Sequence, residues 1–267
     1  MAWSDTAITG SCLGHSTVFM NFLGVRVLTD PVFSKRVGPG VRPFILGPKR
    51  HLAPALMPKE LPAPDVILIS HAHYDHFDAW SLRQFDRQTP VITALATGDL
   101  LRRLGFREVH ELAWGQTLTL NLRAGPLRLT ALEVAHWGAR QMRDTHRGYN
   151  GWLLERGGYG ICYAGDTAYT PAFATLKHRP HPPDLMLMPI GAYDPWIRAH
   201  CSPEQAVAMA REAGARTFVP IHHQTFKLST EPMDEPAARL KAALGDAPPQ
   251  LLAVNVGETF QVPLRVA

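Results

Sequence analysis

Three histidines and an aspartate stand within six residues directly after a short apolar run. The run is Val66–Ile69, and the polar side chains are His71, His73, Asp75 and His76. The run is wholly apolar and too short for a helix, so it predicts a β-strand buried on both faces. Imidazole nitrogen and carboxylate oxygen bind zinc and similar cations, whereas structural zinc usually recruits cysteine, which is absent near this loop. The spacing therefore predicts a catalytic metal site at the end of a rigid strand.

The loop offers more ligands than one tetrahedral ion with an open position would use, which predicts two divalent metal ions. His71 and His73 can converge on the first ion, while Asp75 and His76 can turn toward the second. We expect zinc, with manganese and iron as the alternatives.

Further ligands are expected at other strand ends. Three apolar runs, over residues 127–135, 159–164 and 216–221, are followed by His136, by Asp166 and by the pair His222-His223. Together with the loop they supply five histidines and two aspartates, the complement that two ions need if one carboxylate bridges them. The assignment places His71, His73 and His136 on the first ion, Asp75, His76 and His222 on the second, and Asp166 on both. Neighbouring strand residues point to opposite faces, so only one of His222 and His223 can face the metals, and the alternation does not choose between them.

The first third of the chain is predicted as strands followed by a long loop. Residues 7–22 and 25–28 read as two strands joined by a hairpin at Leu23-Gly24. Seven prolines between Ser34 and Pro64 exclude regular helix there. A loop of this length in a compact domain is usually functional, so we expect it to form one wall of the active site.

The rest of the chain mixes strands and helices. Helices are expected over residues 79–85, 98–104, 203–212 and 235–244, and further strands over residues 90–94, 108–112, 116–121, 152–155, 184–190 and 251–254. Ser202, Pro203 and Gln205 form the start signal of the third helix, a capping box with proline at the first position. With no Gly/Ser-rich linker and no repeat, residues 1–267 are expected to form a single domain.

Composition narrows the class of protein. Three widely spaced cysteines, Cys12, Cys162 and Cys201, do not make a disulfide framework, which favours a reducing compartment and a cytoplasmic location. No apolar run approaches the ~20 residues that cross a bilayer, and the start carries no signal-peptide pattern. We expect a protein without stable membrane insertion, and the sequence does not indicate an oligomeric state.

The formal charge of +4 gives little support to nucleic-acid binding, because the basic residues are scattered. The densest basic group comprises Lys35, Arg36, Arg42, Lys49 and Arg50. It is interleaved with glycine and proline rather than with stacking aromatics, and is predicted to be a solvated loop. No nucleic-acid partner is expected.

The string His71-Ala-His73-Tyr-Asp75-His76 resembles the His-x-His-x-Asp-His signature of the metallo-β-lactamase superfamily. Within it the chain is similar to the branch of N-acyl-phosphatidylethanolamine phospholipase D, with L-ascorbate-6-phosphate lactonase more distant. The supporting strings lie at residues 13–17, 28–34, 46–50, 164–167 and 189–193. The resemblance implies an α/β (α+β) fold, the four-layer αββα sandwich. It also maps the third histidine onto His136 and favours His222 over His223.

The expected chemistry is hydrolysis, because a water bridging two divalent ions yields a hydroxide near neutral pH. Asp75 can orient this nucleophile, and the resemblance places His200 in a pocket loop, where it is either a catalytic donor or an exposed histidine. Asp30 is either a carboxylate that orients a ligand histidine or a turn residue before Pro31, and His15 carries the same alternatives.

Three functions follow from these residues. The first is a phosphodiesterase for a small-molecule or lipid-like phosphodiester. The second is a lactonase or carboxylic ester hydrolase, since the same nucleophile attacks carbonyl carbon. The third is a non-catalytic metal-binding regulatory protein, against which the full ligand set argues. Ribonuclease function is disfavoured because no RNA-binding arm is apparent.

Overall fold

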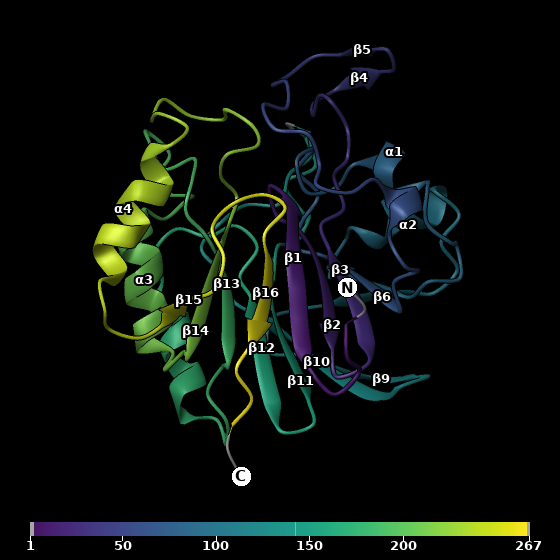
Figure 1. Cartoon of the computed structure of the whole chain (residues 1–267). Coiled ribbons are helices and arrows are strands. Elements are labelled where there is room, and N and C mark those ends of the chain that lie inside the picture. The colour runs from purple at the N-terminus through teal and green to yellow at the C-terminus, as the bar shows by residue number, and fades with distance from the viewer. Residues whose placement is uncertain (1–2, 142, 266–267) are drawn as a thin grey trace.

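The computed structural model describes residues 3–141 and 143–265, and two large sheets packed face to face dominate it (Figure 1). The first sheet has the strand order β16 (Thr259–Val262), β1 (Ile8–Gly14), β2 (Thr17–Phe22), β3 (Val25–Thr29), β6 (Val66–Ile69), β7 (Val91–Ala94), β8 (Val109–Leu112). The second has the order β15 (Gln250–Leu251), β14 (Thr217–Ile221), β13 (Leu185–Pro189), β12 (Tyr159–Tyr163), β11 (Gly151–Arg156), β10 (Gly125–Leu132), β9 (Thr117–Leu122).

Helices cover the outer face of each sheet, giving the expected four layers (Figure 1). The first sheet packs against the short helices α1 (Ala79–Leu82) and α2 (Gly98–Arg103). The second packs against the 3₁₀ helix η2 (Pro171–His178) and the helices α3 (Pro203–Glu212) and α4 (Glu235–Leu244). The fold class implied by the resemblance is confirmed.

Side-chain alternation explains why the central strands read as continuous apolar runs. Leu185 and Leu187 of β13 lie in the core between the sheets, whereas Met186 and Met188 lie in the cluster under the helices. The strand β6 alternates in the same way between the inter-sheet core and the cluster under α1 and α2. Both faces of such a strand are buried, so polar residues are expected only where the strand ends.

Local capping chemistry is as predicted from the sequence. The Ser202 side chain accepts a hydrogen bond from the Gln205 backbone N–H, and the Gln205 side chain accepts one from the Ser202 N–H. This capping box satisfies two N–H groups that a helix start otherwise leaves unpaired. Asp78 caps α1 by accepting from the Trp80 N–H. The expected extension of that helix to residue 85 is wrong, since it ends at Leu82.

The amino-terminal segment departs from the prediction. Residues 7–22 form two antiparallel strands rather than one, because the chain reverses at His15-Ser16 between β1 and β2. His15 takes a positive φ of 58°, a conformation that an alternation pattern does not reveal. The carboxy-terminal strand β16, which pairs with β1, was not predicted, and the expected strand at 251–254 is limited to Gln250–Leu251.

The proline-rich stretch from 34 to 64 is only partly irregular. It contains the two-stranded ribbon β4 (Gly40–Val41) and β5 (Phe44–Ile45) and the 3₁₀ helix η1 (Pro58–Glu60). Its first half shares a groove with Tyr74 and Phe77 of the histidine loop. Its second half turns away and, with β1 and β2, lines a separate cavity of about 1010 Å³. Only the first half is therefore placed to border the site.

The strand directions bring the predicted ligands to one edge. β3 and β6 are parallel neighbours in the first sheet, and β12, β13 and β14 are parallel neighbours in the second. β10 runs in the same direction as β12, because both are antiparallel to β11. Side chains that follow the carboxyl ends of these strands can therefore meet across the two sheets.

Candidate metal centre

Asp166, which follows β12, lies at the centre of a cluster of histidines. Its Oδ2 atom is close to five imidazole nitrogens: 3.1 Å from His76 Nε2, 3.1 Å from His222 Nε2, 3.8 Å from His136 Nε2, 3.8 Å from His200 Nδ1 and 4.0 Å from His71 Nε2. Its Oδ1 atom is buried and has no hydrogen-bond partner. One carboxylate thus faces histidines from both sheets.

The first group of nitrogens comes from His71, His73 and His136. His73 Nδ1 lies 2.8 Å from His71 Nε2 and 3.3 Å from His136 Nε2. His136 Nδ1 donates to the Ala199 carbonyl at 2.8 Å, so its Nε2 presents a lone pair to the cluster. The Ser70 hydroxyl donates its proton to Asp30, so it accepts a hydrogen bond from His71 Nδ1, which lies 2.9 Å away. His71 Nε2 is therefore unprotonated as well. Converging lone pairs of this kind suit a cation.

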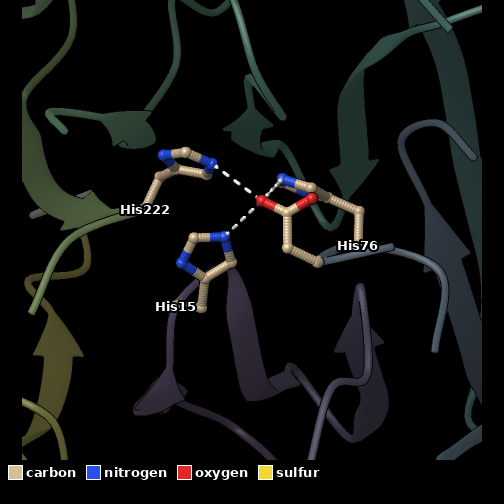
Figure 2. Close-up of side chains that lie close together, drawn as sticks. His15, His76 and His222 are labelled. Atoms are coloured by element: carbon tan, nitrogen blue, oxygen red, sulfur yellow. Dashed lines mark hydrogen bonds and ion pairs between the residues drawn. The ribbon is translucent and has the colours of Figure 1, made fainter. Parts of the chain in front are cut away.

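The second group surrounds Asp75 (Figure 2). Asp75 Oδ2 lies 3.0 Å from His15 Nε2, 3.4 Å from His222 Nε2 and 3.7 Å from His76 Nε2. The Nε2 atoms of His76 and His222 are buried and make no hydrogen bond of acceptable geometry. His15 joins this group because the β1–β2 turn delivers it there, and its backbone N–H donates to Thr225 Oγ1 at 2.6 Å.

Asp30, which follows β3, holds the loop histidines in one orientation. Its Oδ2 accepts from His76 Nδ1 at 2.6 Å, from the Tyr163 hydroxyl at 2.5 Å and from the Ser70 hydroxyl at 2.5 Å, and its Oδ1 accepts from the Ser70 N–H at 2.7 Å. A carboxylate only accepts, so His76 carries a proton on Nδ1, and Nε2 is the nitrogen that it turns toward Asp166. The same carboxylate reaches His71 through Ser70. Of the two readings of Asp30, the structure supports the orienting carboxylate.

The electrostatics separate the histidines into two kinds. Burial lowers the pKa of His136 to about 3 and of His200 to about 4, and it holds the pKa of His71 well below its usual value. Although burial opposes it, the charge of Asp166 raises the pKa of His222 to about 9 and that of His76 well above its usual value. The two carboxylates therefore stabilise positive charge between them, where a divalent cation bound by neutral imidazoles would replace the protons.

The donor set fits bound metal. Four groups of potential ligands lie with their atoms within 4.8 Å of one another: His15, Asp75, His76 and His222; His71, His73 and His136; His71, His76 and Asp166; His136, Asp166 and His200. Buried nitrogen and oxygen atoms without partners are costly unless a further group satisfies them, and here they face one another. All donors are imidazole or carboxylate, the preference of zinc, manganese and iron.

The structure brings His222, and not His223, into this cluster. His222 follows β14 with a positive φ of 60°, and its backbone N–H donates to the His15 carbonyl at 3.1 Å. His223 is buried but belongs to none of the ligand groups found among the described residues, and burial lowers its pKa to about 4. The reversal of the chain at His222 therefore decides between His222 and His223, a choice that strand alternation left open.

His200 lies beside the cluster, in the loop between β13 and α3. Its ring stacks on that of His222 at 5.1 Å and meets that of His136 edge-on at 5.0 Å. Its side chain is 13% exposed, whereas one of the two alternatives from the sequence was an exposed loop histidine. The structure therefore encloses His200 more than that alternative implied. Nδ1 is buried without a partner and faces Asp166.

Arg140 is a residue beside the candidate site that sequence reasoning missed. Its Nη1 donates to the carbonyls of Ala72 at 2.9 Å and Phe77 at 2.8 Å, and its guanidinium lies 3.9 Å from the centroid of the Tyr74 ring. It thereby closes the two ends of the histidine loop. No motif marks it, since an arginine beyond His136 reads as a surface residue.

Other basic residues have structural roles. Arg50 was predicted to lie in a solvated loop, which is wrong for this residue, because it is buried and donates to the carbonyls of Val32 and Ser34. Lys35, Arg36, Arg42 and Lys49 are exposed.

Among residues 3–141 and 143–265, no helix combines the length and apolar character needed to cross a membrane.

Comparison with known proteins agrees with this geometry. Residues 25–223 match the family model of the Beta-lactamase superfamily domain. The chain belongs to the metallo-β-lactamase superfamily. A superfamily relative, N-acyl-phosphatidylethanolamine-hydrolyzing phospholipase D 1 of Caenorhabditis elegans, is 30% identical over 98% of this chain and 78% of its own length. An uncharacterized protein of Mycobacterium tuberculosis is 34% identical over 92% of this chain, which spans 66% of that protein.

Solved structures agree on the superfamily fold. A metallo hydrolase of Ignicoccus hospitalis superposes with a TM-score of 0.70 at 20% identity, covering 97% of this chain and 100% of that one. This chain is therefore similar to metal-dependent hydrolases of the metallo-β-lactamase superfamily.

Proposed function

We propose that this superfamily member is a binuclear phosphodiesterase that hydrolyses a lipid-like or small organic phosphodiester. The observation that carries the proposal is the position of Asp166, whose Oδ2 lies within 4.0 Å of nitrogens from both ligand groups. A carboxylate so placed is suited to bridging two cations. Phosphodiester hydrolysis benefits from a pair of ions that contacts both the attacking and the leaving oxygen.

The residues divide between the two ions as the sequence predicts. His71, His73 and His136 would hold the first ion, Asp75, His76 and His222 the second, and Asp166 both. When bound, the ions supply a hydroxide nucleophile at neutral pH and neutralise the negative charge that develops on the phosphoryl group.

Two side chains of the chain are placed to assist the reaction. The pKa of Asp75 is held well below its usual value by His76 and His15, against the effect of burial, so its carboxylate stays ionised and can orient a hydroxyl group. His200 is neutral near pH 7, since burial lowers its pKa to about 4, and its ring N–H can donate a hydrogen bond to a phosphoryl or leaving-group oxygen. Both would act as catalytic residues.

The choice of a phosphodiester rests on the curated relatives. Two of them, from C. elegans and Saccharomyces cerevisiae, are named N-acyl-phosphatidylethanolamine-hydrolyzing phospholipase D, at 30% and 31% identity. The chain spans 78% of the first and 52% of the second. Their substrate class is the one that we extend to this protein.

A substrate panel tests the function. The purified protein, loaded with zinc or with manganese, is offered a bis-aryl phosphodiester, an N-acyl homoserine lactone and an aryl carboxylic ester, and its metal content is measured by mass spectrometry. We expect two equivalents of metal, preferential turnover of the phosphodiester, and loss of turnover on chelation. A preference for the lactone or the ester, activity that survives chelation, or a single bound ion would each contradict the proposal.

Variants separate metal binding from chemistry. His200→Gln should lower kcat for the phosphodiester while two metals stay bound, because His200 is assigned to substrate rather than to an ion. Asp166→Asn should lose metal and activity together. If His200→Gln instead loses metal, the histidine belongs to the ligand set and its catalytic role is wrong.

A further inference from the structure

Residues 35–50 form a basic ribbon that projects from the body of the protein (Figure 1). β4 and β5 pair antiparallel through Gly40↔Ile45 and Val41↔Phe44. Three large apolar side chains stand on it in solvent: Val41 and Phe44, each 81% exposed, and Leu46, 73% exposed. These are the three most exposed large apolar residues among those the structure describes, and clustered exposure of this kind marks an interaction surface.

The ribbon is a built element with an anchored base. A Cβ atom on Gly38, Gly40 or Gly47 would overlap a carbonyl oxygen of the opposite strand, so close backbone approach requires glycine at these three positions. Val37 at the base is buried against Val32 and Phe226. Exposure of the tip is therefore a property of a defined hairpin rather than of a loose loop.

The ribbon carries positive charge only. Its sixteen residues include Lys35, Arg36, Arg42, Lys49 and Arg50 and no aspartate or glutamate, and the first four of these cations are exposed. Arg42 lies with its guanidinium 4.2 Å from the centroid of the Trp80 ring, at the side of the ribbon. Cations around an apolar tip match an anionic lipid surface, where headgroup charges lie above the acyl chains.

The ribbon shares a groove with the loop that carries the clustered histidines. Val41, Arg42 and Ile45 line one groove together with Tyr74 and Phe77 of the histidine loop.

More exposed aromatic and aliphatic residues come from the loops that deliver two of the clustered histidines. Trp137 follows His136 and is 56% exposed, with its ring 4.9 Å from that of His73. Trp196 and Ile197, 56% and 43% exposed, precede His200. Exposed apolar residues therefore lie both on the ribbon and on loops that carry two of the clustered histidines.

We propose that the basic ribbon docks this protein onto an anionic lipid surface. Val41, Phe44 and Leu46 enter the interface between headgroups and acyl chains, while Lys35 and Lys49 meet the lipid phosphates. This is peripheral binding and requires no membrane-spanning segment. It goes beyond the proposed hydrolase function and does not depend on it, since docking needs neither metal nor turnover.

The test is co-sedimentation of the full chain with vesicles of phosphatidylcholine alone and of phosphatidylcholine mixed with phosphatidylglycerol. We expect binding to the anionic vesicles that is about tenfold tighter or more, and that weakens as salt is added. Two variant sets address the two components: Val41→Ser/Phe44→Ser/Leu46→Ser for the tip, and Lys35→Gln/Lys49→Gln for the charge. Each set should weaken binding about tenfold or more.

Matched controls keep the result specific. Leu95→Ser/Leu264→Ser changes exposed apolar residues elsewhere, and Lys59→Gln/Lys177→Gln removes the same charge elsewhere, so both should bind like the parent protein. All four variants should retain the parent melting temperature and hydrolysis of a water-soluble substrate. Asp166→Asn, inactive under the proposed function, should still bind vesicles, which separates failure of one proposal from failure of the other.

Three results would overturn the proposal. The first is equal binding to neutral and anionic vesicles. The second is anionic binding that the ribbon variants leave unchanged. The third is evidence that the ribbon binds another partner. A change of oligomeric state in the tip variant, measured by analytical ultracentrifugation, would assign the tip to a second copy of the chain. Displacement of the protein from vesicles by a single-stranded oligonucleotide, with direct binding of that oligonucleotide through Lys35 and Lys49, would assign the ribbon to nucleic acid.

Discussion

Nε2 of His222 lies 3.1 Å from Oδ2 of Asp166, although the two residues follow different strands, β14 and β12. The strand between them, β13, pairs in parallel with both, so the two carboxyl ends open on the same side of the sheet. The same oxygen is 3.1 Å from His76 Nε2, which comes from the other sheet. Asp166 therefore contacts histidines that follow strands of both sheets.

Asp166→Asn should remove metal and activity together. The neutral amide lacks the negative charge that would balance bound cations. Loss of an outer partner of a ligand typically costs about 10- to 100-fold in metal affinity, so loss of the shared carboxylate should cost more than about 100-fold. Metal content by mass spectrometry and phosphodiester turnover measure this. Asp246→Asn, at an exposed position, is the matched control, and an Asp166→Asn protein with full metal would contradict the assignment.

His222→Ala and His223→Ala should behave differently although the residues are adjacent. Only His222 faces the carboxylates, so its loss should abolish turnover and the binding of one metal equivalent. His223→Ala should retain both metals and keep turnover within about tenfold, since a buried imidazole away from the cluster contributes packing. Isothermal titration of the metal-free proteins with zinc distinguishes them. Equal losses in both variants would remove the distinction that the structure draws.

Asp30→Asn should weaken the site without touching a ligand position. The amide cannot accept from His76 Nδ1, Tyr163 and Ser70 together, so the tautomer of His76 is no longer fixed. We expect metal affinity to fall about 10- to 100-fold and the free energy of unfolding to fall by about 1–3 kcal/mol. Tyr163→Phe, which removes one donor and leaves the carboxylate, should lower stability by about 1 kcal/mol and keep metal. Unchanged metal affinity in Asp30→Asn would leave Asp30 as a turn residue only.

Arg140→Met should loosen the histidine loop. The substitution keeps apolar contact with Tyr74 but deletes both hydrogen bonds to the carbonyls of Ala72 and Phe77. Hydrogen bonds from a charged donor contribute about 1.5–3 kcal/mol each, so unfolding in denaturant should shift by at least about 2 kcal/mol. Arg140→Lys should restore part of that loss. Arg83→Met, at an exposed position directly after α1, is the control that should change neither stability nor metal content.

The three cysteines should be unreactive in the folded protein. Burial, together with the nearby charge of Glu258, raises the pKa of Cys12 from 9.0 to about 12, and burial raises the pKa of Cys162 and Cys201 further. A thiol pKa that is higher in the folded state stabilises the fold below pH 9.0, and that contribution decreases as the pH rises from 9.0 through about 12.

Titration with an aromatic disulfide reagent measures this protection. At mildly alkaline pH we expect no modification of the native protein and modification of all three free thiols after denaturation. Melting temperatures should decline above pH 9.0. Rapid labelling of native Cys12 would show that its strand opens to solvent.

Much of the candidate site could be predicted because three of the strands that carry it, β6, β12 and β14, are buried on almost every position. In such strands polar residues are expected beyond the last apolar position, which is where His71, Asp166 and His222 lie. His136 follows the partly exposed β10 and was predicted from the apolar residues before it. Residues that reach the cluster from turns carried no such mark. The position of His15 depends on a chain reversal with positive φ inside a segment that the sequence predicts as one long strand. The position of Arg140 depends on how the loop after β10 of the second sheet passes the histidine loop of the first.

The sequence by itself determined the types of the candidate ligands, the strand ends at which they stand and the capped helix α3. Each follows from local residue types and their spacing. Only the tertiary structure decided between His222 and His223. It also showed that Asp30 accepts a hydrogen bond from His76 and that the basic ribbon projects beside the histidine loop. The physical reason is that these relationships join segments far apart in the chain. Their geometry is set by how two sheets pack and where the backbone turns, which no local pattern encodes.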